Sequence, residues 1–238
     1  MRGQSKEHRC LDRVNLGCGP NQPKNWLNVD GSWNAWLSNH VLLRKALSSI
    51  GILNGDNPGA NWNGGTLIHD LTKPLPFGTR TVGNIYASHV LEHLYREDGR
   101  KLLKECWRVL RPSGTLRVVV PDLRSMVMQY WSRKNGDGSE SSNYGAADLL
   151  NEALAFRDPS PPRGNILLRF YYLSKDFHHH KWMYDSELLV QSMEAAGFVE
   201  VRERGYLDSD ICGIEEVEQP TRVLNGAGIC VEGKRPQE

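Results

Sequence analysis

The 238-residue chain lacks both a strong net charge and a long hydrophobic segment. Its formal net charge is +1, so the overall composition does not favour binding to nucleic acid or to an anionic membrane. No apolar run approaches the ~18 residues of a membrane span. The first residues, MRGQSKEHRCLDR, are charged and lack the apolar core of a signal peptide. We therefore expect a cytoplasmic protein without a membrane span.

Paired cysteines are also missing. The five cysteines stand at positions 10, 18, 106, 212 and 230, without a C-x-x-C pair. Such spacing favours reduced thiols over disulfides or a cysteine-based zinc site. With 39% hydrophobic residues, the chain is long enough to build one domain with a substantial core. We expect a single domain over residues 1–238.

The segment VNLGCGPNQPKNWLNVD, residues 14–30, looks like a nucleotide-binding loop with a part missing. The dinucleotide fingerprint has a third glycine and an acidic residue ~20 positions further on. Here Asn21 stands where the third glycine is expected, and Asp30 follows Gly17 by only 13 positions. Two prolines between them leave room for a turn rather than a helix.

This shortened loop favours a ligand without phosphates. A pyrophosphate is held by the N-terminus of the helix after the loop, and that helix is missing here. S-adenosylmethionine needs only close backbone approach, which Gly17 and Gly19 permit because they lack a Cβ. Asn21 can replace a glycine because asparagine tolerates left-handed conformations. The two oxygens of Asp30 can accept from two ribose hydroxyls.

Short apolar runs alternate with helical patterns along the rest of the chain. We expect strands at residues 13–16, 26–29, 66–69, 82–87, 116–120, 198–201 and 228–232, and amphipathic helices at 97–110 and 185–196. The alternation predicts an α/β fold with a mainly parallel sheet. Long insertions at 32–63 and 122–184 interrupt it. The second is rich in aromatic residues, and segments of this kind commonly form lids or substrate loops.

Five segments follow one another in the order of a known family: NLGCG, NVD, HDLTKPLPF, ASHVLEHL and ECWRVLRPSGTLRVVVPD. On these segments the chain resembles class I S-adenosylmethionine-dependent methyltransferases of the type-11 kind. The resemblance implies a Rossmann-like fold with a seven-stranded, mainly parallel sheet and an antiparallel last strand. The short first loop and the stretch HKWMYD further resemble methyltransferases encoded beside sugar- and polysaccharide-modifying enzymes.

The resemblance implies cofactor contacts in the first half of the chain. Gly17 and Gly19 would contact the methionine end of S-adenosylmethionine through their backbone, and Asp30 would hold the ribose. Asp30 and Asp70 could instead cap strand ends or form turns. We favour ligand contacts, because open α/β sheets bind ligands at the carboxyl ends of their strands.

The same resemblance assigns the adenine and the sulfonium ends. Asp70 would accept a hydrogen bond from the adenine amino group, and Leu71 would present its backbone beside the ring. Ser88 and His89, at the tip of the fourth strand, would line the sulfonium pocket.

His89, Glu92 and His93 form the pattern H-x-x-E-H, which binds zinc when both histidines lie on one face of a helix. Here the pattern begins at a strand tip and no third ligand is evident in the sequence. We expect it to be incidental, with Glu92 and His93 opening the next helix and no metal bound. A metal-dependent hydrolase stays the less favoured alternative, beside a non-catalytic protein that binds a nucleoside or a partner.

Three consecutive histidines, His178, His179 and His180, precede a Lys-Trp pair. A metal site, a general base and an exposed polar loop all fit them. Because an unperturbed imidazole has a pKa near ~6.5, any of the three suits proton removal at neutral pH. We select His180 first, as the residue next to the Lys-Trp pair. The expected acceptor is a small molecule or saccharide, methylated at oxygen or nitrogen and bound by segment 122–184, with no nucleic-acid partner.

Overall fold

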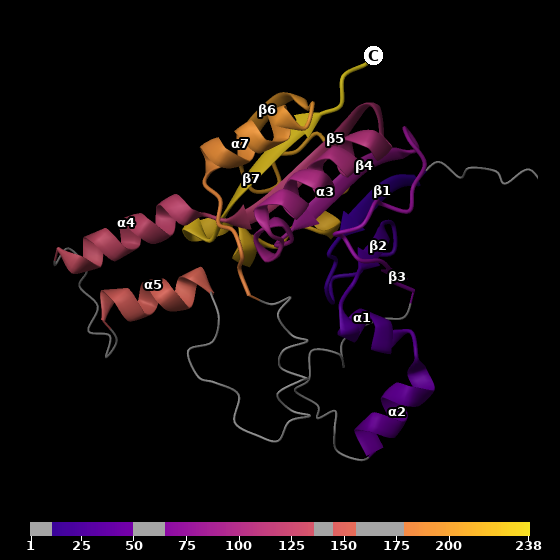
Figure 1. Cartoon of the computed structure of the whole chain (residues 1–238), viewed down its shortest axis with the longest axis horizontal. Coiled ribbons are helices and arrows are strands. Elements are labelled where there is room, and N and C mark those ends of the chain that lie inside the picture. Colours follow the sequence, from indigo (N-terminus) through magenta and orange to yellow (C-terminus); the bar gives the residue numbers. More distant parts are fainter. Residues whose placement is uncertain (1–10, 50–64, 136–144, 156–178) are drawn as a thin grey trace, which may run out of the picture.

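A single seven-stranded sheet organises the chain (Figure 1). The computed structural model describes residues 11–49, 65–135, 145–155 and 179–238. The strand order is β3-β2-β1-β4-β5-β7-β6. The strands are β1 (Leu11–Leu16), β2 (Leu27–Asp30), β3 (Leu67–Ile68), β4 (Val82–Ser88), β5 (Leu110–Pro121), β6 (Val199–Arg204) and β7 (Gly228–Lys234).

The strand directions match the predicted fold. The strands from β1 to β5 pair in parallel, whereas β7 runs antiparallel to both β5 and β6. The expected Rossmann-like α/β fold with an antiparallel last strand is therefore confirmed. Because the chain moves from β1 outward to β2 and β3 and then returns to place β4 on the other side of β1, the connections reverse between β1 and β4.

Strand β5 differs most from its expected bounds. It begins at Leu110, directly after helix α3 (Arg96–Val109), rather than at residue 116. The pairing with β4 shifts register between Val82 and Asn84, and Ser113 has a φ of +61°. The residues between the expected helix and the expected strand thus form an irregular start of β5, and the regular part lies where the β-branched run predicted it.

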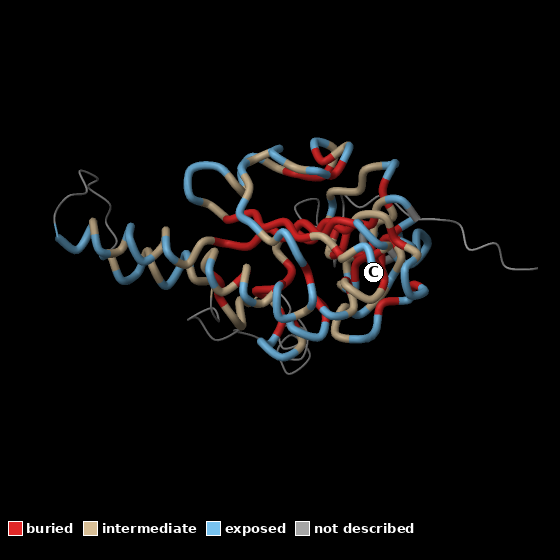
Figure 2. Tube along the Cα trace, turned by 90° about the horizontal axis from the view of Figure 1, so that it is seen from above, coloured by how far each residue is buried: buried red, intermediate tan, exposed pale blue. Residues whose placement is uncertain are grey.

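Helices α3 and α7 (Ser186–Ala195) cover one face of the sheet (Figure 1). The apolar residues of α3 recur at helical spacing and are buried, and α7 begins where the Asp185 carboxylate accepts a hydrogen bond from Leu188 N at 2.8 Å. Alternate residues of β5 point to the same side, where they share one core with both helices. Buried residues concentrate along the sheet, as Figure 2 shows.

The opposite face is covered by segment 205–227, which contains three short 3₁₀ turns: η4 (Ile214–Glu216), η5 (Pro220–Arg222) and η6 (Leu224–Gly226). A second apolar core lies beneath it, formed by Trp26, Tyr86, Val119, Ile211, Ile214, Val217 and Cys230. Arg117 of β5 is fully buried on this side, with Nε 2.7 Å from Glu218 Oε1 and Nη1 3.0 Å from Glu232 Oε1. The ion pair between Arg117 and Glu218 fixes segment 205–227 to the sheet.

The remaining helices lie beside the carboxyl edge of the sheet. They are α1 (Trp33–Ser38), α2 (Val41–Ser49), α4 (Leu123–Lys134) and α5 (Ala146–Leu154), with the 3₁₀ turn η2 (Leu91–His93) before α3. Helices α4 and α5 pack together and extend away from the sheet, and neither contains a buried residue (Figures 1 and 2). Across the described ranges, no helix is both long and apolar enough to cross a membrane.

Candidate functional site

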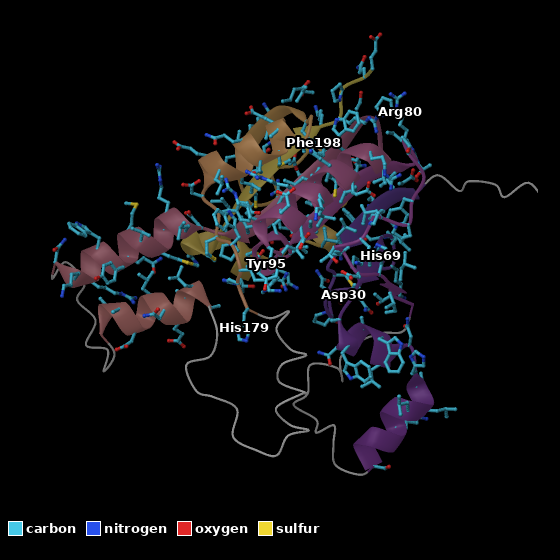
Figure 3. The ribbon with its side chains drawn as sticks, viewed as in Figure 1. Asp30, His69, Arg80, Tyr95, His179 and Phe198 are labelled. Carbon is cyan, nitrogen blue, oxygen red and sulfur yellow. The ribbon has the colours of Figure 1, made fainter. Side chains whose placement is uncertain are left out.

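The predicted cofactor residues gather at one edge of the sheet. They follow the carboxyl ends of β1, β2, β3 and β4, and the chain reverses its order between β1 and β4. Open α/β sheets bind ligands at such a reversal. In Figure 3, Asp30 and His179 lie on this side of the body, whereas Arg80 and Phe198 lie on the opposite side.

A tight turn follows β1, as the glycines predicted. Gly17 has a φ of +61° and Gly19 a φ of +55°, a left-handed region that other residues enter only with strain. A Cβ on Gly17 would overlap the Val90 side chain, so the glycine lets the loops after β1 and β4 touch. Cys18, between the glycines, is buried, and burial raises the pKa of its thiol to about 12. The thiol therefore packs within the turn and is unreactive near neutral pH.

The expected reason for Asn21 is wrong. Asn21 is not among the residues with positive φ, so it does not replace a left-handed glycine. Its side chain instead donates to Val217 O at 2.8 Å, and its own carbonyl accepts from Asn15 Nδ2 at 3.2 Å. Residues 17–26 contain no helix, as expected. The turn is thus fixed by side-chain contacts to β1 and to segment 205–227.

Asp30 ends β2 directly beside this turn. Its side chain is 8% exposed, Oδ2 accepts from Gly19 N at 3.0 Å, and Oδ1 accepts from Ser32 N at 2.7 Å. Each carboxylate oxygen has two lone pairs, so each keeps one for a further donor. Asp30 therefore links the glycine turn to the start of α1 and can still accept two hydroxyls.

Asp70 follows β3 and is exposed. Its Oδ1 accepts from the backbone N and the side-chain Oγ1 of Thr72, at 2.9 and 2.8 Å. Partial burial opposes ionisation, but these hydrogen bonds prevail and lower the pKa of the carboxyl. Leu71 packs against the main core, with one methyl near Gly17. Asp70 therefore forms a turn, which is the alternative role considered for it. None of the described residues donates a hydrogen bond to its Oδ2.

Ser88 ends β4 and His89 follows it, at the strand tip as predicted. Ser88 is buried, and Arg222 Nη1 lies 3.3 Å from its Oγ and 3.4 Å from its carbonyl oxygen. His89 has a φ of +55°, and its backbone N donates to Val119 O at 2.9 Å. Its side chain turns toward Glu92, with Nδ1 3.0 Å from Oε1. A strained backbone at a strand tip of this kind is common at binding sites.

The H-x-x-E-H pattern acquires the third partner that the sequence did not reveal. Glu92 and His93 lie in the 3₁₀ turn η2 rather than at the start of α3. One ligand atom from each of Glu92, His93 and His180 lies within 4.8 Å of the other two. The rings of His93 and His180 are 5.0 Å apart, at 60° to one another. His180 is thus a third candidate ligand, which the sequence alone did not make evident.

Backbone contacts hold His180 at this cluster. Lys181 N and Trp182 N both donate to Glu92 O, at 2.6 and 3.2 Å, and His180 N donates to Ala155 O at 3.1 Å. Burial lowers the pKa of both His93 and His180, against the opposing effect of the Glu92 charge. Both rings therefore favour the neutral form, which has a lone pair to offer.

Among the other described residues of the histidine run and of HKWMYD, none contributes a ligand atom to the cluster. The His179 carbonyl is 3.3 Å from His93 Nδ1, and His178 lies outside the described residues. Tyr184 is buried against α3, where burial raises the pKa of its phenol to about 12. Asp185 is the N-cap of α7, so both residues have structural contacts.

Segment 205–227 is the part of the site that sequence analysis missed. It contacts the glycine turn through Asn21 and the tip of β4 through Arg222. Segment 205–227 therefore lies beside the predicted site together with the ends of segment 122–184, whose acceptor-binding role stays a prediction. A separate groove between α3 and α7, lined among others by Arg96 and Lys104, shares no residue with the predicted cofactor site.

A sequence profile for a methyltransferase domain, that of the type-11 methyltransferase family, matches residues 14–118. These residues run from β1 into β5 and contain every predicted cofactor contact. No curated protein matches the chain in sequence.

Solved structures with a similar chain path are distant in sequence. An S-adenosylmethionine-dependent methyltransferase from Archaeoglobus fulgidus has a TM-score of 0.47 at 16% identity, over 95% of this chain and 87% of its own. A chain from the complex of a methyltransferase activator with a methyltransferase of Haloferax volcanii has a TM-score of 0.46 at 15% identity, over 95% and 83%. A methyltransferase from Thermotoga maritima has 0.43 at 15% identity, over 94% and 82%.

Proposed function

We propose that this chain, which matches the type-11 methyltransferase profile over residues 14–118, is an S-adenosylmethionine-dependent methyltransferase that methylates an oxygen or nitrogen atom of a small-molecule or saccharide acceptor. S-adenosylmethionine supplies a methyl group that the cationic sulfur already activates. What remains for the protein is to bind the two partners in line, exclude water and accept a proton. The residues at the carboxyl edge of the sheet fit these tasks.

The proposed cofactor site follows the four parallel strands in order. Asp30 carries the argument, because its buried carboxylate is fixed by Gly19 N and Ser32 N and keeps lone pairs for the two ribose hydroxyls. The turn after β1 would receive the methionine end, the turn after β3 the adenine, and the tip of β4 the sulfonium. The proposed contacts are Gly17, Gly19, Asp30, Asp70, Leu71, Ser88 and His89.

The acceptor is proposed to bind beside the tip of β4. Segment 122–184 begins at the end of β5 and returns at Tyr184, which forms a bridge with Asp122. Both ends of the segment are therefore anchored at the carboxyl edge, next to His89. This arrangement supports an acceptor-binding role for the segment within one domain of residues 1–238. The cytoplasmic location and the lack of a nucleic-acid partner stay predictions.

Within the histidine run, we assign His180 to the acceptor. Its backbone is tied to Ala155, and its ring lies beside Glu92 and His93. An imidazole at this place can promote loss of the acceptor's proton as the methyl group is transferred. His178 and His179 remain candidates for the same task.

Methyl transfer from isotopically labelled S-adenosylmethionine to a panel of alcohols, amines and saccharides tests this proposal. The variant His180→Ala should lower kcat by ~10²–10⁴ while the affinity for S-adenosylhomocysteine stays near wild type. The matched control is His40→Ala, because His40 stacks on Trp36 at the end of α1, away from the cluster. Lost cofactor affinity in His180→Ala would place this histidine over the nucleoside, and an unchanged kcat would remove it from the reaction.

A further inference from the structure

A buried carboxylate at the acceptor end of the site lacks hydrogen-bond partners. Glu92 is fully buried, and neither side-chain oxygen accepts a hydrogen bond from the described residues. The His89 imidazole approaches Oε1 at 3.0 Å, but without hydrogen-bond geometry. Buried carboxylates are costly unless they are paired, hydrogen-bonded or bound to a metal. This carboxylate is therefore expected to have a further partner.

Two imidazoles converge on the same place. His180 Nδ1 is buried and has no hydrogen-bond partner among the described residues. His93 Nδ1 lies 3.3 Å from the His179 carbonyl oxygen, which can accept only from a protonated Nδ1 and so leaves the Nε2 lone pair free. A backbone carbonyl commonly orients metal-binding histidines in this way.

We propose that Glu92, His93 and His180 bind one divalent transition-metal ion, with Zn²⁺ as the probe ion. Two imidazoles and one carboxylate form a donor set that zinc accepts at catalytic sites, where three protein ligands leave one position open. The three ligand atoms lie within 4.8 Å of one another, so small side-chain movements would bring them to a shared ion. From the sequence alone no metal is expected, because the H-x-x-E-H pattern begins at a strand tip and no third ligand is evident.

The backbone fixes this arrangement before any ion binds. His180 lies 88 positions after Glu92, yet Lys181 N donates to the Glu92 carbonyl at 2.6 Å. Nearby cationic groups stack on aromatic rings: Arg96 lies over Trp182 at 4.8 Å. In the part of the chain that the structure describes, no arginine forms an ion pair with Glu92. The one ion-pair contact of Glu92 among the described residues is with His89, which is cationic only when protonated, so with a neutral His89 the carboxylate charge can bind a metal cation.

Such an ion deepens the proposed function and, in its effect on catalysis, rests on it. When bound, a cation beside the acceptor oxygen would favour the deprotonated form of the acceptor, and His180 would then promote proton loss as a ligand rather than as a free base. The acceptor O–H bond breaks and its proton passes to solvent water. The oxygen bonds to the methyl carbon, and the sulfur keeps the electron pair of the broken C–S bond, which yields S-adenosylhomocysteine.

Metal titration of the full chain tests the site without reference to activity. The protein is stripped with chelator, and Zn²⁺ binding is measured by competition with a chromophoric chelator. Co²⁺ absorption in the visible range then reports the ligand geometry. We expect one equivalent of Zn²⁺, with affinity reduced by more than about 10–100-fold in His93→Ala and in His180→Ala, because that range applies even to groups that only orient ligands. His40→Ala should bind like wild type.

The outcomes separate this proposal from the proposed function. No tight equivalent of Zn²⁺, or an equivalent that both variants retain, would overturn the metal site and leave cofactor binding untouched. Zinc bound in wild type without methyl transfer to any acceptor would instead contradict the proposed function. Because Glu92→Gln removes a buried charge and can alter folding, the half-buried His180 supplies the decisive variant, and circular dichroism verifies that it is folded.

Discussion

Removal of the Asp30 charge should weaken cofactor binding in a measurable way. In Asp30→Asn, the amide oxygen can still accept from Ser32 N. The amide NH₂ then faces Gly19 N, at about the 3.0 Å that separates Asp30 Oδ2 from Gly19 N in the wild type. Two hydrogen-bond donors therefore oppose each other. A hydrogen bond to a charged group contributes ~1.5–3 kcal/mol, and a stranded donor costs ~1–3 kcal/mol. The ribose hydroxyls lose an acceptor at the same time.

We expect the Kd for S-adenosylhomocysteine to rise by about 5- to 150-fold, which corresponds to ~1–3 kcal/mol. Isothermal titration calorimetry measures this change, and thermal unfolding of the ligand-free variant reports the effect on the glycine turn separately. Asp12→Asn is the matched control, because Asp12 is 82% exposed and lies in β1 away from the carboxyl edge. A folded Asp30→Asn variant with wild-type affinity would refute the role of Asp30 in binding the ribose.

Two further predictions concern the glycine turn and the thiols. Gly17→Ala should lower the free energy of unfolding by more than Gly19→Ala does. Both glycines have positive φ, and the strain of a left-handed alanine costs ~1–2 kcal/mol at either position. Only at Gly17 would the added Cβ also meet another side chain. Equal melting temperatures would contradict this. Iodoacetamide at pH 8 should alkylate the exposed Cys212 and spare the buried thiols, which peptide mapping would measure. Burial raises the pKa of the Cys18 thiol to about 12, so rapid alkylation of Cys18 would contradict the packing described. The buried thiols are Cys18, Cys106 and Cys230.

The sheet could be predicted because its information is local. Runs of β-branched residues such as 116–120 form strands wherever both faces are covered, and Gly17 and Gly19 signal a turn by themselves. The shortened loop also predicted that no helix follows the glycine turn. The bounds of β5 were harder to predict from the sequence, because they depend on pairing with β4 across a register shift at Val82.

The contacts that complete the site could not be predicted, because they join distant residues. His180 meets Glu92 only because the backbone after His180 donates to the Glu92 carbonyl. Segment 205–227 has no helical or strand period. Its fold depends on buried Arg117, which binds Glu218. In the sequence, Arg117 is an interruption in an apolar run, and its partner lies 101 positions away.

Binding of S-adenosylhomocysteine, compared with NAD, tests the central claim most directly. Isothermal titration calorimetry of the full chain should show one equivalent of S-adenosylhomocysteine bound and no heat of binding for NAD. The physical reason is that the turn after Gly19 offers no helix N-terminus to a pyrophosphate, whereas Asp30 keeps acceptors for a ribose. Binding of NAD without binding of S-adenosylhomocysteine would contradict the account.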